Sequence, residues 1–131
     1  MLRTLLSVSA IVMSLSTAPV LAHHSFTAEY DFAKPVTIQG IVVKWELINP
    51  HGWITLDVKD AEGKVVRWAI ETGNPNALLR AGWRKDSLKP GDEVTIDGYL
   101  AKDGSATVNG VQVKLADGRK VLAASSAGSG R

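Results

Sequence analysis

Residues 36–58 read VTIQGIVVKWELINPHGWITLDV and comprise two apolar runs joined by a short polar turn. The first run covers residues 36–45. Before Gly40 its apolar side chains alternate, so they lie on one face of an extended strand; after Gly40 apolar side chains lie on both faces. A glycine between two phases favours a bend or bulge, which would let one strand serve two sheets. The second run, residues 53–60, alternates regularly between apolar and polar residues. This stretch therefore predicts two β-strands, of which the first is long and bent.

Three more strands are predicted downstream, and each is an alternating run that follows a turn sequence. They cover residues 65–71, 93–101 and 106–115. Val121 and Leu122 are a candidate short edge strand. The side chains expected in the core are Leu56, Val58, Val66, Trp68, Ile70, Val94 and Ile96.

One short helix is predicted from Asn74 to Ala81, between the third and fourth strands. Asn74 suits the N-cap position, and Pro75 suits the first helical position. Gly82 can adopt the left-handed conformation that often follows the end of a helix.

The predicted order of three strands, a helix and two strands is the order of the OB-fold. We therefore expect a mainly β protein, a small five-stranded OB-like barrel with one short helix between strands 3 and 4. Another small β-barrel or roll with the same element order is the alternative. OB-folds hold ligands on the face of strands 2 and 3 and in the loops after strands 1 and 4. Residues 45–53 form the first of these loops.

Residues 1–22 have the pattern of a secretory signal peptide. Arg3 supplies the positive charge, and residues 5–15 form an apolar segment that is too short to span a bilayer. Cleavage after Ala22 would make His23 the first residue of the mature chain. An uncleaved membrane anchor is the alternative.

The cleaved chain is expected to have three parts: an N-terminal arm (residues 23–35), the barrel domain (residues 36–122) and a disordered tail (residues 123–131). The tail reads AASSAGSGR and is small and polar throughout. With no second apolar span, the expected location is the periplasm or the medium, without stable membrane insertion. The chain has no cysteine, which excludes disulfides and thiolate metal sites.

Charge and motifs argue against several classes of function. The net charge is +2, and basic and acidic residues alternate along the chain rather than forming a basic stripe, so no nucleic-acid partner is expected. No cysteine nucleophile, G-x-S-x-G motif or phosphate-binding loop is present. The partner is an unknown ligand or protein, and binding is expected rather than catalysis.

The three histidines suggest a metal site for Cu(II). A mature N-terminal His23 would offer its α-amine and its ring Nδ1 to one ion, and His51 or His24 would add a third nitrogen. Such a nitrogen set suits tetragonal Cu(II), whereas Zn(II) prefers tetrahedral sites. The arrangement resembles the histidine brace of exported copper proteins. Glu46 and Glu71 are the carboxylates expected nearest to it.

A metal-free interpretation uses the same loop. In this interpretation the OB-like module binds an oligosaccharide, a peptide or a protein partner, and the tryptophans beside the loop form a stacking platform. The same tryptophans could instead pack within the fold. The candidate ligand-binding residues are Trp45, Glu46, Asn49, His51 and Trp53.

The motifs resemble a family of small uncharacterised exported bacterial proteins, and the resemblance covers nearly all of the mature chain. Its members have an HHSF segment after the signal peptide and a WExxNPHxW core, which are here residues 23–26 and 45–53. The resemblance implies a domain of unknown function and brings no assigned activity. The further matching segments are residues 56–60, 68–71, 76–83, 89–94 and 102–105.

Overall fold

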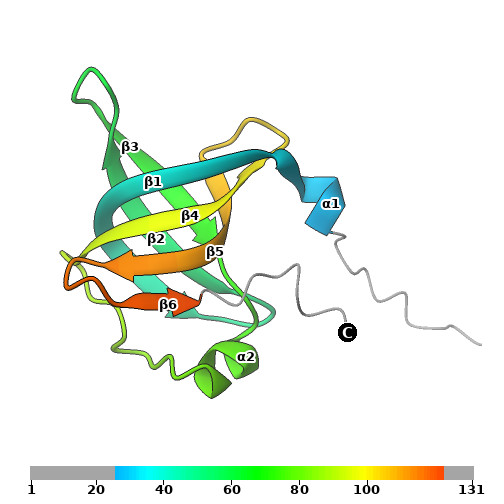
Figure 1. Ribbon diagram of the computed structural model, residues 1–131, viewed down its shortest axis with the longest axis vertical. Coiled ribbons are helices and arrows are strands. Elements are labelled where there is room, and N and C mark those ends of the chain that lie inside the picture. Colours follow the sequence, from blue (N-terminus) through cyan, green and yellow to red (C-terminus); the bar gives the residue numbers. More distant parts are fainter. Residues whose placement is uncertain (1–25, 123–131) are drawn as a thin grey trace, which may run out of the picture.

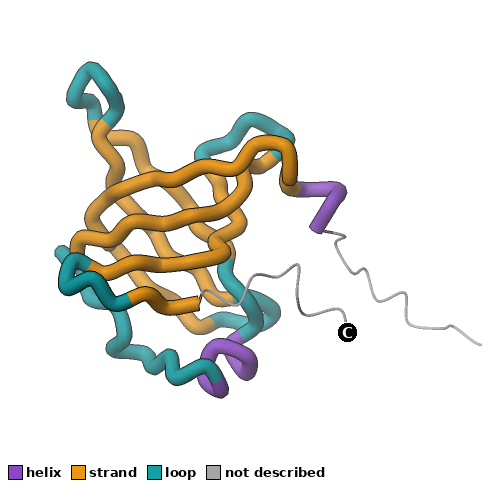
Figure 2. The backbone as a smooth tube through the Cα atoms, in the orientation of Figure 1, coloured by secondary structure: helices purple, strands orange, loops and turns teal. Residues whose placement is uncertain are grey.

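The computed structural model describes residues 26–122, which form a mainly β fold (Figures 1 and 2). Two short helices accompany six strands. In chain order the elements are α1 (Phe26–Glu29), β1 (Tyr30–Leu47), β2 (Gly52–Lys59), β3 (Val65–Glu71), α2 (Pro75–Arg80), β4 (Glu93–Ala101), β5 (Thr107–Leu115) and β6 (Lys120–Leu122).

The strands form one sheet in the order β3-β2-β1-β4-β5-β6, and all neighbours in this order are antiparallel. An additional parallel pairing joins residues 69–71 of β3 to residues 107–109 of β5. This pairing closes the sheet into the ring-like arrangement visible in Figure 1. The predicted element order is present, but β6 pairs with the end of β5 and adds a sixth strand to the expected five.

β1 bends because it pairs with β4 through its first part and with β2 through its last part. The two pairings meet at Ile41, which is the register partner of Glu93 in β4 and of Asp57 in β2. A Cβ on Gly40 would lie 2.8 Å from the carbonyl oxygen of Asp57, so only glycine permits this close passage. β1 curves between its two partners, as the glycine led us to expect, but both partners belong to one sheet rather than two (Figure 1).

β1 begins at Tyr30, within the segment that we expected to be an irregular arm. Tyr30 pairs with Ala101, the register then breaks, and pairing resumes at Pro35. Inside the break, the carboxylate of Asp31 accepts a hydrogen bond from the backbone N–H of Ala33 at 3.0 Å. The alternation of apolar residues does not extend into this segment, so periodicity gave no signal for it.

α2 begins and ends where the capping residues of its sequence predict. The side chain of Asn74 accepts a hydrogen bond from the backbone N–H of Ala77 at 2.9 Å, which makes it the N-cap. Pro75 occupies the first turn, and Gly82 after the helix has a φ of +96°.

The core lies inside the ring and under α2. Of the seven expected core residues, four are buried and three, Val58, Val66 and Trp68, are half-buried. Since β5 pairs with β3 only at residues 69–71, the preceding half of β3 keeps more exposure than expected. The buried apolar cluster consists of Ile38, Val42, Ile54, Leu56, Ile70, Leu78, Trp83, Leu88, Val94, Ile96, Val108 and Val113.

Several predictions concern residues outside the described range. These are the signal peptide (residues 1–22), His23, His24 and the disordered tail (residues 123–131). Within residues 26–122, no helix has the length and apolar character needed to cross a membrane.

Candidate functional site

His51 lies in the β1–β2 loop, residues 48–51, at the position just before β2. The loop contains a cis peptide bond between Asn49 and Pro50. Its first three residues are exposed, while His51 is half-buried. The loop therefore turns its histidine toward the body of the protein.

Gly52, the residue after His51, is held against the residues that follow β3. Its backbone N–H donates to the carbonyl of Gly73, and its carbonyl accepts from the N–H of Thr72, both at 2.9 Å. A Cβ on Gly52 would lie 2.6 Å from Oγ1 of Thr72 and 2.9 Å from Cδ1 of Leu78. This close packing fixes the backbone from which the His51 side chain projects.

The imidazole of His51 meets a buried carboxylate. Its Nδ1 lies against Oε1 of Glu71, the last residue of β3. The side chain of Glu71 is 5% exposed and that of His51 is 26% exposed. Because a carboxylate oxygen accepts hydrogen bonds, Nδ1 carries the proton at this contact. In the neutral ring Nε2 is then the unprotonated nitrogen, with a lone pair to offer to a ligand.

The second oxygen of the same carboxylate binds the N-terminal segment. The hydroxyl of Tyr30 donates a hydrogen bond to Oε2 of Glu71. Burial raises the pKa of Tyr30 far above its ordinary value, and the hydrogen bond and charge of Glu71 raise it further. Tyr30 therefore remains a hydrogen-bond donor throughout the neutral range.

The turn between β4 and β5 fixes the segment that carries Tyr30. The backbone N–H of Lys102 donates to the carbonyl of Glu29 at 2.8 Å, and its Nζ donates to the carbonyl of Thr27 at 2.6 Å. A cleft of about 580 Å³ lies along this junction, and its lining residues are Ala28, Glu29, Tyr30, Ala101, Lys102, Asp103, Ser105 and Thr107. The β1–β2 loop and the β4–β5 turn are thus linked through Tyr30 and Glu71.

The two tryptophans beside the loop have different surroundings. Trp45 packs against Trp83 with ring centroids 4.9 Å apart, and its indole N–H donates to the carbonyl of Arg84 at 3.0 Å. Trp53 is half-buried and is the register partner of Glu71, so it stands beside the histidine contact. Trp45 is therefore committed to packing, while Trp53 is the tryptophan adjacent to the site.

The remaining candidates lie apart from the carboxylate contact. Glu46 forms an ion pair with Lys44 at 2.5 Å, and Asn49 is exposed in the loop. Of the two carboxylates expected near the histidines, the one that contacts His51 is Glu71. Among residues 26–122, no group of three or more His, Cys, Asp or Glu side chains is placed to hold a metal ion.

Tyr30 is the site residue whose role we did not anticipate. It is separated from Glu71 by 41 positions in the sequence. Its aromatic character indicated only that it could pin the arm to the body of the protein. A tyrosine in an aromatic segment gives no signal of a particular hydrogen-bond partner.

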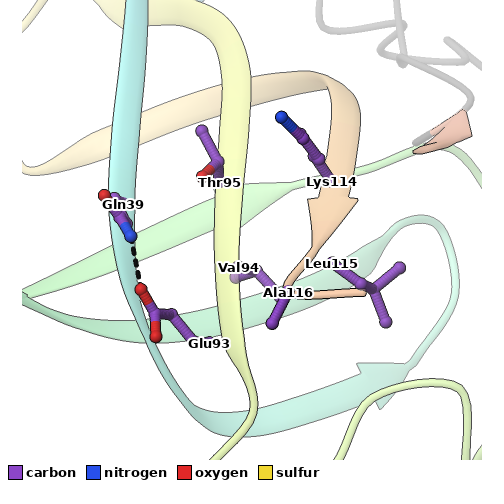
Figure 3. Close-up of a pocket in the computed structure, with 7 residues that line it drawn as sticks. All are labelled: Gln39, Glu93, Val94, Thr95, Lys114, Leu115 and Ala116. Atoms are coloured by element: carbon purple, nitrogen blue, oxygen red, sulfur yellow. Dashed lines mark hydrogen bonds between the residues drawn. The ribbon is translucent and has the colours of Figure 1, made fainter. Parts of the chain in front are cut away.

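A second hollow, of about 300 Å³, lies on β1, β4 and the end of β5 (Figure 3). Gln39 donates a hydrogen bond to the carboxylate of Glu93 along one of its walls. None of the candidate residues belongs to it. Its lining residues are Gln39, Glu93, Val94, Thr95, Lys114, Leu115 and Ala116.

A family model described as "Family of unknown function (DUF6152)" matches residues 10–112. Neither a curated protein nor a solved structure matches the chain.

Proposed function

The chain belongs to DUF6152, a family of unknown function, and on that premise we propose that it is an exported module that binds Cu(II). The ion is held by Nε2 of His51 and by the α-amine and ring Nδ1 of a mature N-terminal His23. His24 is the alternative source of the third nitrogen. The protein acts in the periplasm or outside the cell, as a binding protein rather than an enzyme.

The topology supports an OB-like barrel as the scaffold of this site. The strands follow the OB order, with α2 between β3 and β4, and the β3–β5 pairing closes the ring. In OB-folds the loops after strands 1 and 4 hold ligands. Here the first of these loops carries His51, and the second anchors the segment of Tyr30 through Lys102.

The observation that carries the proposal is the contact between His51 and Glu71. Histidines that bind metals commonly donate their second ring N–H to a carboxylate, which fixes the ring and increases the basicity of the ligating nitrogen. The Nδ1 of His51 has such a carboxylate, and Glu71 is itself buried in the end of β3. The contact therefore has the arrangement of a metal-binding histidine and its supporting carboxylate.

The docking of the N-terminal segment supports a contribution of His23 to the metal site. Tyr30 connects this segment to Glu71, and hence to His51, through one hydrogen bond. The nitrogen-rich ligand set favours Cu(II) over Zn(II), which prefers a tetrahedral arrangement.

The test uses exported protein whose first residue is verified as His23 by N-terminal sequencing. We expect one Cu(II) per chain by isothermal titration calorimetry, with nitrogen hyperfine structure in the electron paramagnetic resonance spectrum. An acetyl group on the α-amine of His23 should weaken binding by orders of magnitude, because it removes one of the two nitrogens that His23 offers to the ion. His51→Ala should weaken it as well, and Lys59→Ala, an exposed change on β2, is the matched control.

Three results would contradict the proposal in whole or in part. Equal Cu(II) affinity of the native and N-terminally acetylated proteins would exclude the N-terminal chelate. A mature chain that begins elsewhere would remove its premise. Binding that depends on His24 but not on His51 would restrict the site to the N-terminal arm. If no Cu(II) is bound, the metal-free interpretation remains, in which the loop binds an oligosaccharide, peptide or protein.

A further inference from the structure

The carboxylate of Glu71 is shared by two side chains from distant parts of the chain. His51 lies against Oε1 and Tyr30 donates to Oε2. Both Glu71 and Tyr30 are buried. A buried carboxylate with one oxygen unpaired would carry a desolvation cost, so the two contacts support one another.

The Tyr30 hydrogen bond also determines how the carboxylate is oriented. A carboxylate that rotates about its last bond can place either oxygen against His51 or turn both away. With Oε2 fixed by the hydroxyl of Tyr30, Oε1 remains directed at Nδ1 of His51. We infer that Tyr30 is a positioning residue: acting through Glu71, it holds the His51 ring with its proton on Nδ1 and leaves Nε2 for the ligand.

The position of Tyr30 in the fold gives this contact a second consequence. Tyr30 belongs to the N-terminal segment, which Lys102 tethers through the carbonyls of Thr27 and Glu29. Docking of this segment and orientation of His51 therefore depend on the same carboxylate. By linkage, a ligand that requires the oriented ring also favours the docked segment, and the two effects have equal size.

The inference about the ring does not require a metal, and only its effect on Cu(II) affinity rests on the proposed function. The first measurement is therefore made on metal-free exported protein labelled with ¹⁵N. Long-range ¹H–¹⁵N spectra report which ring nitrogen of His51 carries the proton. We expect a single tautomer, protonated on Nδ1, in the wild type and in the control Tyr99→Phe. Tyr30→Phe and Glu71→Met should give a mixture of tautomers.

The second measurement is a double-mutant cycle on Cu(II) affinity. Loss of a group that supports a metal-binding histidine typically costs about 10- to 100-fold in affinity. We expect a loss of about 10-fold for Tyr30→Phe and up to about 100-fold for Glu71→Met. Because Tyr30 acts through Glu71, the double variant should bind no more weakly than Glu71→Met alone.

The outcomes separate the two ideas. If the wild type binds no Cu(II), the proposed function fails, and the tautomer spectra still decide the inference. A wild-type tautomer in folded Tyr30→Phe, or independent and multiplicative losses in the cycle, would overturn the inference. Should Tyr30→Phe not fold, Glu71→Met decides the inference: a mixture of tautomers supports it, and a wild-type tautomer overturns it, because Tyr30 acts on the ring only through this carboxylate.

Discussion

Trp45 and Trp83 pack against each other with ring centroids 4.9 Å apart and planes inclined by 46°. Trp45 comes from the end of β1, and Trp83 comes from the segment after α2. The indole N–H of Trp45 also donates to the carbonyl of Arg84. This pair fastens the segment after α2 to the part of β1 that leads into the loop of His51.

Trp83→Ala should therefore destabilise the whole domain. Trp83 is 1% exposed, and truncation of a buried aromatic residue to alanine costs about 3–5 kcal/mol. The free energy of unfolding is measured by urea denaturation followed by circular dichroism. Val65→Ala, at a residue 53% exposed, is the control and should change stability by about 0.5 kcal/mol or less. Equal effects of the two substitutions would show that the tryptophan pair does not support the fold.

Tyr30 should make the protein less stable at alkaline pH. Burial and Glu71 raise its pKa, so the folded chain keeps the phenolic proton at a pH where the unfolded chain loses it. Above about pH 10 the unfolded state thus binds fewer protons, and the free energy of unfolding falls by up to about 1.4 kcal/mol per pH unit. The free energy of unfolding of the wild type should exceed that of Tyr30→Phe at neutral pH, and this difference should become smaller above about pH 10.

Ultraviolet absorbance can follow the ionisation of Tyr30 directly, because the chain has only two tyrosines. In Tyr99→Phe the remaining phenol is that of Tyr30, and its ultraviolet phenolate band should rise only as the chain unfolds. Phenolate formation in a chain that is still folded, near the pH of an ordinary tyrosine, would contradict the buried hydrogen bond to Glu71.

Thr72→Val should stabilise the protein. The hydroxyl of Thr72 is fully buried and has no hydrogen-bond partner within the described part of the chain. Burial of an unsatisfied polar group costs about 1–3 kcal/mol, and valine has nearly the same shape as threonine. We expect a gain of about 1 kcal/mol in the free energy of unfolding. Thr72→Ser keeps the hydroxyl and loses the methyl group, so it should destabilise; a destabilising Thr72→Val would indicate a partner for the hydroxyl.

The sequence predicts which helices and strands form better than it predicts the residues at which they begin and end. Residues 65–71 and 93–101 have the predicted boundaries because alternation and turn sequences act within a few residues. α2 is one residue shorter than expected at each end. β1 extends beyond its predicted start because pairing with β4, rather than local periodicity, makes the segment from Tyr30 a strand.

Only part of the candidate site could be derived from the sequence. The turn residues located His51 in a loop, and Glu71 was among the carboxylates expected near it. The hydrogen bond from Tyr30 could not be found in this way, since it depends on where the bent β1 and the turn after β4 bring distant residues together. The position of Trp45 allowed two interpretations, a ligand platform or packing within the fold, and only the structure shows that it packs against Trp83.

Cu(II) should raise the melting temperature of the mature protein if His51 is a ligand. An ion that binds only the folded chain stabilises it by about 2.7 kcal/mol at a free concentration of 100 times Kd, which corresponds to about 10 °C or more for a domain of this size. The size of the shift depends on which parts of the chain supply the ligands. His23 and His24 are adjacent in the chain, so a site made by them alone is present in the unfolded state and gives little shift. A site that includes His51 exists only when the fold brings the loop and the N-terminal segment together.

Differential scanning calorimetry with and without Cu(II), followed by addition of a chelator, measures this shift and its reversal. We expect the shift to be lost in His51→Ala and retained in His24→Ala. Glu71→Met should reduce the shift, because Nδ1 of His51 then has no carboxylate to donate to. Tight Cu(II) binding without any change in melting temperature would show that the ion is held by the N-terminal residues alone. In that case the contact between His51 and Glu71 would have to be explained by its contribution to the fold.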